Sequence, residues 1–115
     1  MEPRTLARLA VELAKEKKAN DVVVLDVRRQ TAVTDYFVVC SAPNSIQVRA
    51  IADNIEERLE QGGVLPHHRE GLASARWILL DYGSVVIHVF REEERAFYNL
   101  ERLWGQASDA VDLRP

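Results

Sequence analysis

Apolar residues recur along the chain at two spacings, and each spacing predicts a different kind of element. Within residues 6–13 the apolar positions are three or four apart, so they share one face of an amphipathic helix that begins at Pro3 and stops near Asn20. The same spacing over residues 48–59 predicts a second amphipathic helix, which ends at Gly62.

Local signals support the start of the second helix and a third helix near the end of the chain. Asn44 stands three residues before Gln47, a spacing that resembles a capping box. Three glutamates at 92–94 suit the positive end of a closing helix. The apolar face of this closing helix is expected to comprise Phe97, Leu100, Leu103 and Trp104.

Short runs rich in β-branched residues predict four strands, at residues 22–27, 36–40, 76–80 and 85–90. The first two strands are neighbours and are expected to pair antiparallel. The strand before the second helix and the strand after it can pair in parallel through a right-handed crossover. Residues 81–84 predict a hairpin turn, and residues 64–75 an irregular connection.

The elements follow the order α-β-β-α-β-β-α, which predicts an α/β fold with one domain on a mixed sheet. A length of 115 residues suits one domain, and 47% hydrophobic with 29% charged residues suits a packed globule rather than a disordered chain. We expect the domain to span residues 1–105 and residues 106–115 to form a flexible tail.

Several observations predict a cytoplasmic protein. No apolar run approaches the ~20 residues that a membrane span requires, and no secretory signal is visible. The single cysteine, Cys40, cannot form an intramolecular disulfide, which fits a reducing cytosol.

The charge balance favours a protein partner over naked nucleic acid. Fifteen basic and eighteen acidic residues give a formal net charge of −3, whereas binding through phosphates favours a basic excess. We therefore expect a basic protein partner and no sequence-specific nucleic-acid binding, although ordinary solubility favours the same small negative charge.

Residues that could hold a metal or act as nucleophiles lack the partners that such chemistry needs. His67 and His68 are adjacent and diverge, and no second ligand pair has helical or hairpin spacing, so we expect a solvated loop and no metal site. Cys40 lies within a predicted strand with no lysine or histidine nearby in sequence, which indicates a buried, inert thiol. The glycines match neither a phosphate-binding loop nor a dinucleotide fingerprint, so we predict no cofactor.

The pair Gly83 and Ser84 is similar to the start of a nucleotidyltransferase active site. In such enzymes acidic residues follow the pair and hold two magnesium ions. Residues 85–90 contain no Asp-x-Asp, so the pair indicates a turn and no catalytic residue is predicted.

The second hairpin has two apolar faces of different character. Strand alternation puts five aliphatic residues on one side, which predicts that this side belongs to the core: Ile78, Leu80, Val85, Ile87 and Val89. The other side is aromatic and amphipathic, a composition enriched at protein interfaces. The candidate partner-binding residues are Trp77, Leu79, Asp81, Tyr82, His88 and Phe90. Tyr82 is included because a turn residue can leave the strand alternation. The alternative is that a terminal helix simply covers this face.

Six segments together carry a family resemblance. They are DVVVLDV (21–27), TDYFVV (34–39), QVRAIAD (47–53), EG (70–71) ahead of Trp77, LDYGSVVIHVF (80–90) and RAFYNLERLW (95–104). The combination is highly specific and covers nearly the whole chain, which resembles the ribosomal silencing factor family, also called Iojap-like proteins. Two residues depart from the family pattern: Ala42 replaces a common glycine and affects the loop, and Ser84 replaces a common aspartate beside the expected interface.

The resemblance implies a nucleotidyltransferase-like fold without catalytic residues and a translation regulator that is not an enzyme. Members bind the large ribosomal subunit through ribosomal protein L-fourteen and thereby block joining with the small subunit when nutrients are scarce. Organellar relatives act in large-subunit assembly. Two further possibilities stay open: a residual nucleotide-binding enzyme on the same fold, and a homodimer formed through the aromatic face.

Overall fold

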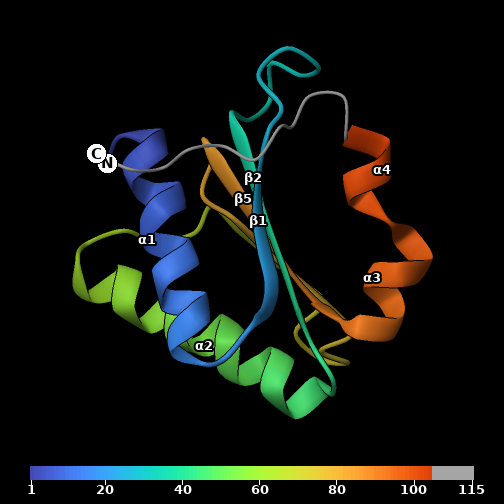
Figure 1. Ribbon diagram of the computed structural model, residues 1–115. Coiled ribbons are helices and arrows are strands. Elements are labelled where there is room, and N and C mark those ends of the chain that lie inside the picture. The colour runs from blue at the N-terminus through green and yellow to red at the C-terminus, as the bar shows by residue number, and fades with distance from the viewer. Residues whose placement is uncertain (105–115) are drawn as a thin grey trace.

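The computed structural model describes residues 1–104, in which a five-stranded mixed sheet lies between two layers of helices (Figure 1). The strands are arranged in the order β1-β2-β5-β4-β3. The elements are α1 (Pro3–Glu16), β1 (Asn20–Asp26), β2 (Tyr36–Ala42), α2 (Ser45–Gln61), β3 (His68–Glu70), β4 (Trp77–Asp81), β5 (Val85–Arg91), α3 (Glu92–Tyr98) and α4 (Leu100–Trp104). The predicted α/β fold on a mixed sheet is confirmed. The proposed tail, residues 106–115, lies outside the described residues.

The sheet topology confirms two predicted pairings and corrects a third. β1 pairs antiparallel with β2, and β4 with β5 across the hairpin turn, as expected. The parallel neighbour of β2 is β5, however, and not β4, the strand predicted to follow the second helix. The two strands of a tight hairpin run in opposite directions, so only one of them can be parallel to β2. β5 takes the central place because its residues from Val85 to Phe90 are all buried.

The connection over residues 64–75 is not wholly irregular, because it contains the short strand β3. His68 of β3 stands opposite Asp81 of β4, and Glu70 stands opposite Leu79. All three residues of β3 are exposed, so the strand forms a charged edge of the sheet.

Side-chain hydrogen bonds join the end of α1 to the start of α2. The Asn44 side chain accepts the backbone N–H of Gln47 at 2.9 Å, which is the cap expected from the sequence. The Gln47 amide in turn donates to two carbonyls just after α1, each at 3.3 Å. α1 ends at Glu16, earlier than the predicted Asn20, because Lys18 adopts a left-handed conformation with φ 59° and Asn20 already begins β1.

The predicted closing helix is divided into α3 and α4 at Asn99. This residue has φ 47°, and its N–H donates to the carbonyl of Arg95 at 2.9 Å, which ends α3. The break interrupts the helical periodicity between α3 and α4. As a result Phe97 and Leu103 are 80% and 74% exposed, so the expectation that both contribute to a buried apolar face is wrong.

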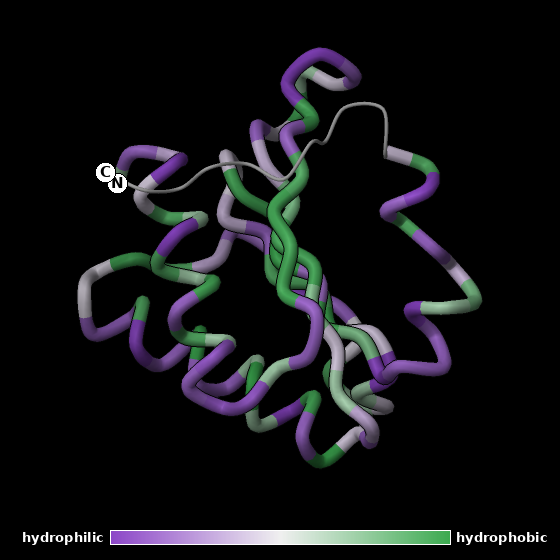
Figure 2. Tube along the Cα trace, viewed as in Figure 1, coloured by the Kyte–Doolittle hydropathy of each residue, from purple (hydrophilic) through white to green (hydrophobic). Residues whose placement is uncertain are grey.

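Two separate apolar clusters hold the domain together, one on each face of the sheet. The larger packs α1 and α2 against the strands and includes the five aliphatic hairpin residues predicted as core, all with no exposed surface. The smaller packs α4 against the opposite face, around Phe90, Val39 and Leu100. Figure 2 shows the strongly apolar strands at the centre and mixed polarity along the helices.

Candidate protein-binding surface

Aromatic rings gather on the sheet face that α3 and α4 cover. We call Phe37 of β2, His88 and Phe90 of β5, and Trp77 of β4 the aromatic face, and we call α3 and α4 together the terminal arm. Trp77 stands directly opposite Phe90 across the β4–β5 ladder, and Phe37 stands opposite Val86 across the β2–β5 ladder. Strand pairing therefore fixes the positions of these rings.

Trp77 is the centre of the aromatic face. Its ring stacks on Phe90 with centroids 4.8 Å apart and contacts Tyr98 of α3 at 4.9 Å. Its indole N–H donates to Nδ1 of His88 at 3.1 Å. The side chain remains partly exposed while its polar atom is already satisfied within the protein. Such a residue offers apolar area to a partner without leaving an unpaired donor behind.

His88 is buried among these rings and is neutral at pH 7. It is 4% exposed, and burial lowers its pKa to about 4. Because Nδ1 accepts from Trp77, the proton of the neutral ring lies on Nε2. Nε2 is buried and finds no hydrogen-bond partner within residues 1–104. His88 therefore acts as an apolar ring and an acceptor that orients Trp77.

Three further predicted site residues, Phe90, Leu79 and Asp81, differ in their exposure. Phe90 is fully buried, so it supports Trp77 from beneath rather than facing a partner. Leu79 stands opposite His88 and is partly exposed. Asp81 is partly exposed at the end of β4, where one carboxylate oxygen accepts the N–H of Gly83 at 2.8 Å.

Tyr82 is not brought together with the other five candidates. It is 5% exposed and belongs to the apolar cluster on the α1 and α2 side of the sheet. Burial, with a contribution from the nearby Glu56 carboxylate, raises the pKa of Tyr82 to about 12. The turn therefore leaves Tyr82 on the face that strand alternation dictates.

The terminal arm covers the aromatic face only in part, and it contributes rings that the sequence analysis did not assign to the site. Tyr98 contacts Trp77, and Trp104 of α4 contacts Phe37 with centroids 5.1 Å apart. Tyr98 is 47% exposed and its ring contacts the more exposed Phe97 at 5.1 Å. The signal that could have found them is the density of aromatic residues in segment 95–104.

The described residues offer little for catalysis. Within residues 1–104 there is no group of three or more His, Cys, Asp or Glu side chains placed to hold a metal ion. Cys40 is fully buried, and burial raises its pKa to about 12, which keeps the thiol protonated. Ser84 has a structural role through its backbone: its carbonyl accepts the N–H groups of Asp35 and Tyr36, which joins the hairpin turn to the start of β2. In the same part of the chain no helix is both long and apolar enough to cross a bilayer.

Comparison with known proteins assigns the chain to a family. The family model described as "Ribosomal silencing factor during starvation" matches residues 1–115. The chain belongs to the ribosomal silencing factor family. The silencing factor RsfS of Bacillus subtilis is 39% identical over 107 residues, which cover 93% of this chain and 91% of that protein. The chloroplastic protein Iojap of Zea mays is 37% identical over 109 residues, and the match covers 86% of this chain and 44% of Iojap.

The fold of the ribosomal silencing factor family is also found in crystal structures. A protein from Chromobacterium violaceum matches with a TM-score of 0.89 and 32% identity, covering 97% of this chain and 94% of the other. The family name indicates a ribosome-associated role, and the bacterial relatives are named ribosomal silencing factors.

Proposed function

We propose that this protein binds the large ribosomal subunit through ribosomal protein L-fourteen and sterically blocks joining with the small subunit, which represses translation when nutrients are limiting. Membership of the ribosomal silencing factor family supports a ribosomal partner. The observation that carries the proposed site is the partly exposed Trp77, held rigidly between Phe90 and Tyr98 at the centre of the aromatic face.

The chemistry of this surface suits a basic protein. Trp77 and Leu79 supply apolar area on a rigid strand, which limits the entropy lost on binding. Asp81 lies on the same strand face and retains one carboxylate oxygen that can accept from a lysine or arginine of the partner. The formal net charge of −3 favours approach to a basic ribosomal protein, while nearby ribosomal RNA opposes it. The protein acts in the cytoplasm, where subunits join.

This function requires no catalysis, cofactor or metal. The buried Cys40 thiol and the absence of an Asp-x-Asp after Gly83 support a regulator that is not an enzyme. Titration with nucleotide and magnesium tests the alternative of a nucleotide-binding enzyme. Turnover that survives repurification and vanishes when an acidic residue of this chain is changed contradicts the proposal.

Gradient sedimentation tests the proposed function directly. The protein is expected to travel with purified large subunits and to reduce the yield of joined ribosomes when small subunits are added. Purified L-fourteen alone is expected to bind the protein. Normal joining at saturating protein contradicts silencing even where binding is observed, and it would leave large-subunit assembly as the role to examine.

One observation favours a second candidate, self-association. Phe97 and Leu103 expose most of their apolar side chains on the terminal arm beside the aromatic face. A homodimer could bury them. Sizing of the protein alone and with L-fourteen distinguishes a stable dimer from a monomer that binds L-fourteen.

A further inference from the structure

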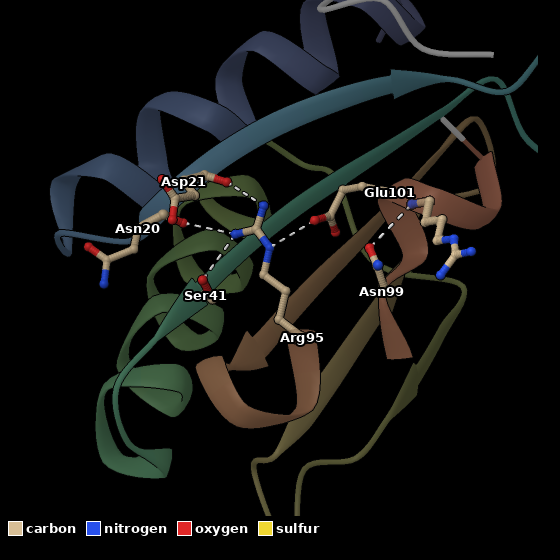
Figure 3. Close-up of polar contacts among 7 residues, drawn as sticks. Asn20, Asp21, Ser41, Arg95, Asn99 and Glu101 are labelled. Carbon is tan, nitrogen blue, oxygen red and sulfur yellow. Dashed lines mark hydrogen bonds and ion pairs between the residues drawn. The ribbon is translucent and has the colours of Figure 1, made fainter. Parts of the chain in front are cut away.

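A nearly buried arginine on α3 joins the terminal arm to the sheet. The side chain of Arg95 is only 11% exposed, and its guanidinium contacts four groups on three other elements (Figure 3). It donates to the Asn20 carbonyl at 3.2 Å, to the Asp21 carbonyl at 2.7 Å and to the Ser41 hydroxyl at 3.0 Å. It also pairs with the Glu101 carboxylate of α4 at 3.4 Å.

The geometry of β1 explains why an arginine is needed here. The pairing of β1 with β2 is irregular between Asn20 and Val23, and Asp21 lies in a left-handed conformation with φ 48°. This irregularity turns two successive carbonyls toward one point, where the guanidinium satisfies both. A planar fork with several donors can reach these carbonyls, the hydroxyl and the carboxylate together, whereas an ammonium group cannot.

Apolar burial does not provide α3 with an anchor of its own. None of the seven residues of α3 is buried, and the ring that it places on the sheet, Tyr98, is 47% exposed. Arg95 precedes Tyr98 by three residues, which puts both side chains on the same side of the helix. The position of Tyr98 over Trp77 therefore depends on where Arg95 fixes α3.

We infer that Arg95 is a positioning residue: its contacts with β1, β2 and α4 hold the terminal arm so that Tyr98 packs on Trp77 and completes the surface offered to the ribosomal partner. The binding part of this inference rests on the proposed function. The positioning part does not, because it concerns the arm and Trp77 in the free protein.

The side-chain N–H resonance of Trp77 in the free protein tests the positioning directly. Tyr98→Leu is expected to shift this resonance, because it removes a neighbouring ring. Arg95→Met, which keeps the apolar stem, is expected to shift it in the same direction and to speed amide exchange in residues 95–103 while the central strands stay protected. The matched control is Arg102→Met, which removes the same charge from an exposed position on α4.

Arg95→Lys keeps the charge and can make only part of the contacts. The Trp77 side-chain N–H resonance of this variant is therefore expected to lie between those of the wild type and of Arg95→Met. Arg95→Lys also serves as the test variant should Arg95→Met not fold. An unshifted Trp77 resonance and unchanged exchange in the arm of a folded Arg95 variant overturn the inference. Equal shifts in the Arg102→Met control overturn it as well, because they would reflect charge alone.

Affinity for purified large subunits separates the inference from the proposed function. We expect Arg95→Met to bind about tenfold more weakly, on the scale of one misplaced aromatic contact, and Arg102→Met to bind like the wild type. Full affinity of an Arg95→Met protein whose arm is released overturns the role of the arm in binding. If Trp77→Ala also retains full affinity, the proposed surface is wrong, while the spectroscopic result still decides whether Arg95 positions Tyr98.

Discussion

The sheet face under α1 and α2 is largely aliphatic and closed, whereas the face under α3 and α4 is aromatic and partly open. Helices of 14 and 17 residues cover the first face, and helices of 7 and 5 residues cover the second. Figure 1 shows the two helical layers on opposite sides of the same sheet. A long amphipathic helix buries a continuous stripe, while a helix of one or two turns leaves large rings at its edges uncovered.

This difference separates stability from recognition. The closed face removes most of its apolar side chains from water, so substitutions there should act on folding. The open face keeps Trp77 and Leu79 available, supported from beneath by the buried Phe90. Substitutions on the closed face should therefore change mainly the free energy of unfolding, and substitutions of the exposed residues of the open face mainly the affinity for the partner.

The largest effect is expected on the closed face. Ile87 is fully buried at the centre of β5, and Ile87→Ala should lower the free energy of unfolding by about 3 to 4 kcal/mol, because it creates a cavity under α1 and α2. Chemical denaturation measures the loss. Affinity of the folded fraction for L-fourteen should not change, and a parallel loss of affinity would show that the two faces are not independent.

The aromatic face should make stability depend on pH through His88. Its pKa is about 4 in the folded protein and about 6.5 in the unfolded chain, so between these values the unfolded state takes up the proton. The contribution of neutral His88 to the free energy of unfolding should therefore be fully present above pH 6.5. It should be lost as the pH falls to 4, which lowers the free energy of unfolding by roughly 3 kcal/mol in all. Unfolding curves of the wild type and His88→Gln, compared at pH 7 and pH 4.5, isolate this contribution. If the free energy of unfolding falls equally in the two proteins between pH 7 and pH 4.5, His88 is not the cause of the pH dependence.

The regular elements could be predicted from the sequence because their periodicity reports burial. The alternation in residues 76–90 separated Ile78 and Leu80 from Trp77 correctly, since β4 and β5 pair along their length. β3 was missed because three exposed, polar residues carry no periodicity, and pairing with β4 alone defines the strand.

The site was predicted less completely than the fold. The turn at Asn99 broke the assumed helix, so Phe97 and Leu103 became exposed although their spacing suited a buried face. The density of aromatic residues in segment 95–104 points to Tyr98, but the contacts of Arg95 and Tyr98 depend on an irregularity in β1 and on a ring in β4, both far away in sequence. Side-chain contacts between distant segments are set by tertiary packing, which periodicity does not describe.

Trp77→Ala should have an intermediate effect that falls mainly on binding. We expect a loss of about 2 kcal/mol in affinity for L-fourteen, the size of a hot spot. Because Trp77 is partly exposed, its removal should cost less stability than the 3 to 5 kcal/mol, roughly, of a fully buried tryptophan. Thermal stability and affinity are measured on the same sample. Glu57→Ala, on the exposed side of α2, is the control and should bind normally. Unchanged affinity in folded Trp77→Ala would move the docking surface to the terminal arm.

The smallest effect is expected for alanine substitutions at two glycines, which share a backbone conformation but lie in different surroundings. Gly63 has φ 81° and Gly71 has φ 80°, so alanine is strained in the same way at both positions. A Cβ at Gly63 meets nothing within 4 Å, whereas a Cβ at Gly71 would lie 1.9 Å from the Trp77 carbonyl oxygen.

Gly71→Ala must therefore displace the backbone that carries Trp77, and Gly63→Ala need not displace anything. We expect Gly71→Ala to be less stable than Gly63→Ala by roughly 1 to 2 kcal/mol, because the added methyl group overpacks the start of β4. Gly71→Ala should also weaken binding of L-fourteen, since it displaces Trp77 from its stacking position on Phe90, while Gly63→Ala should bind normally. Denaturation and affinity of the two variants measure both differences. Equal affinities would mean that the partner tolerates a displaced Trp77, and the rigid placement of that ring on the open face would then not be what the partner recognises.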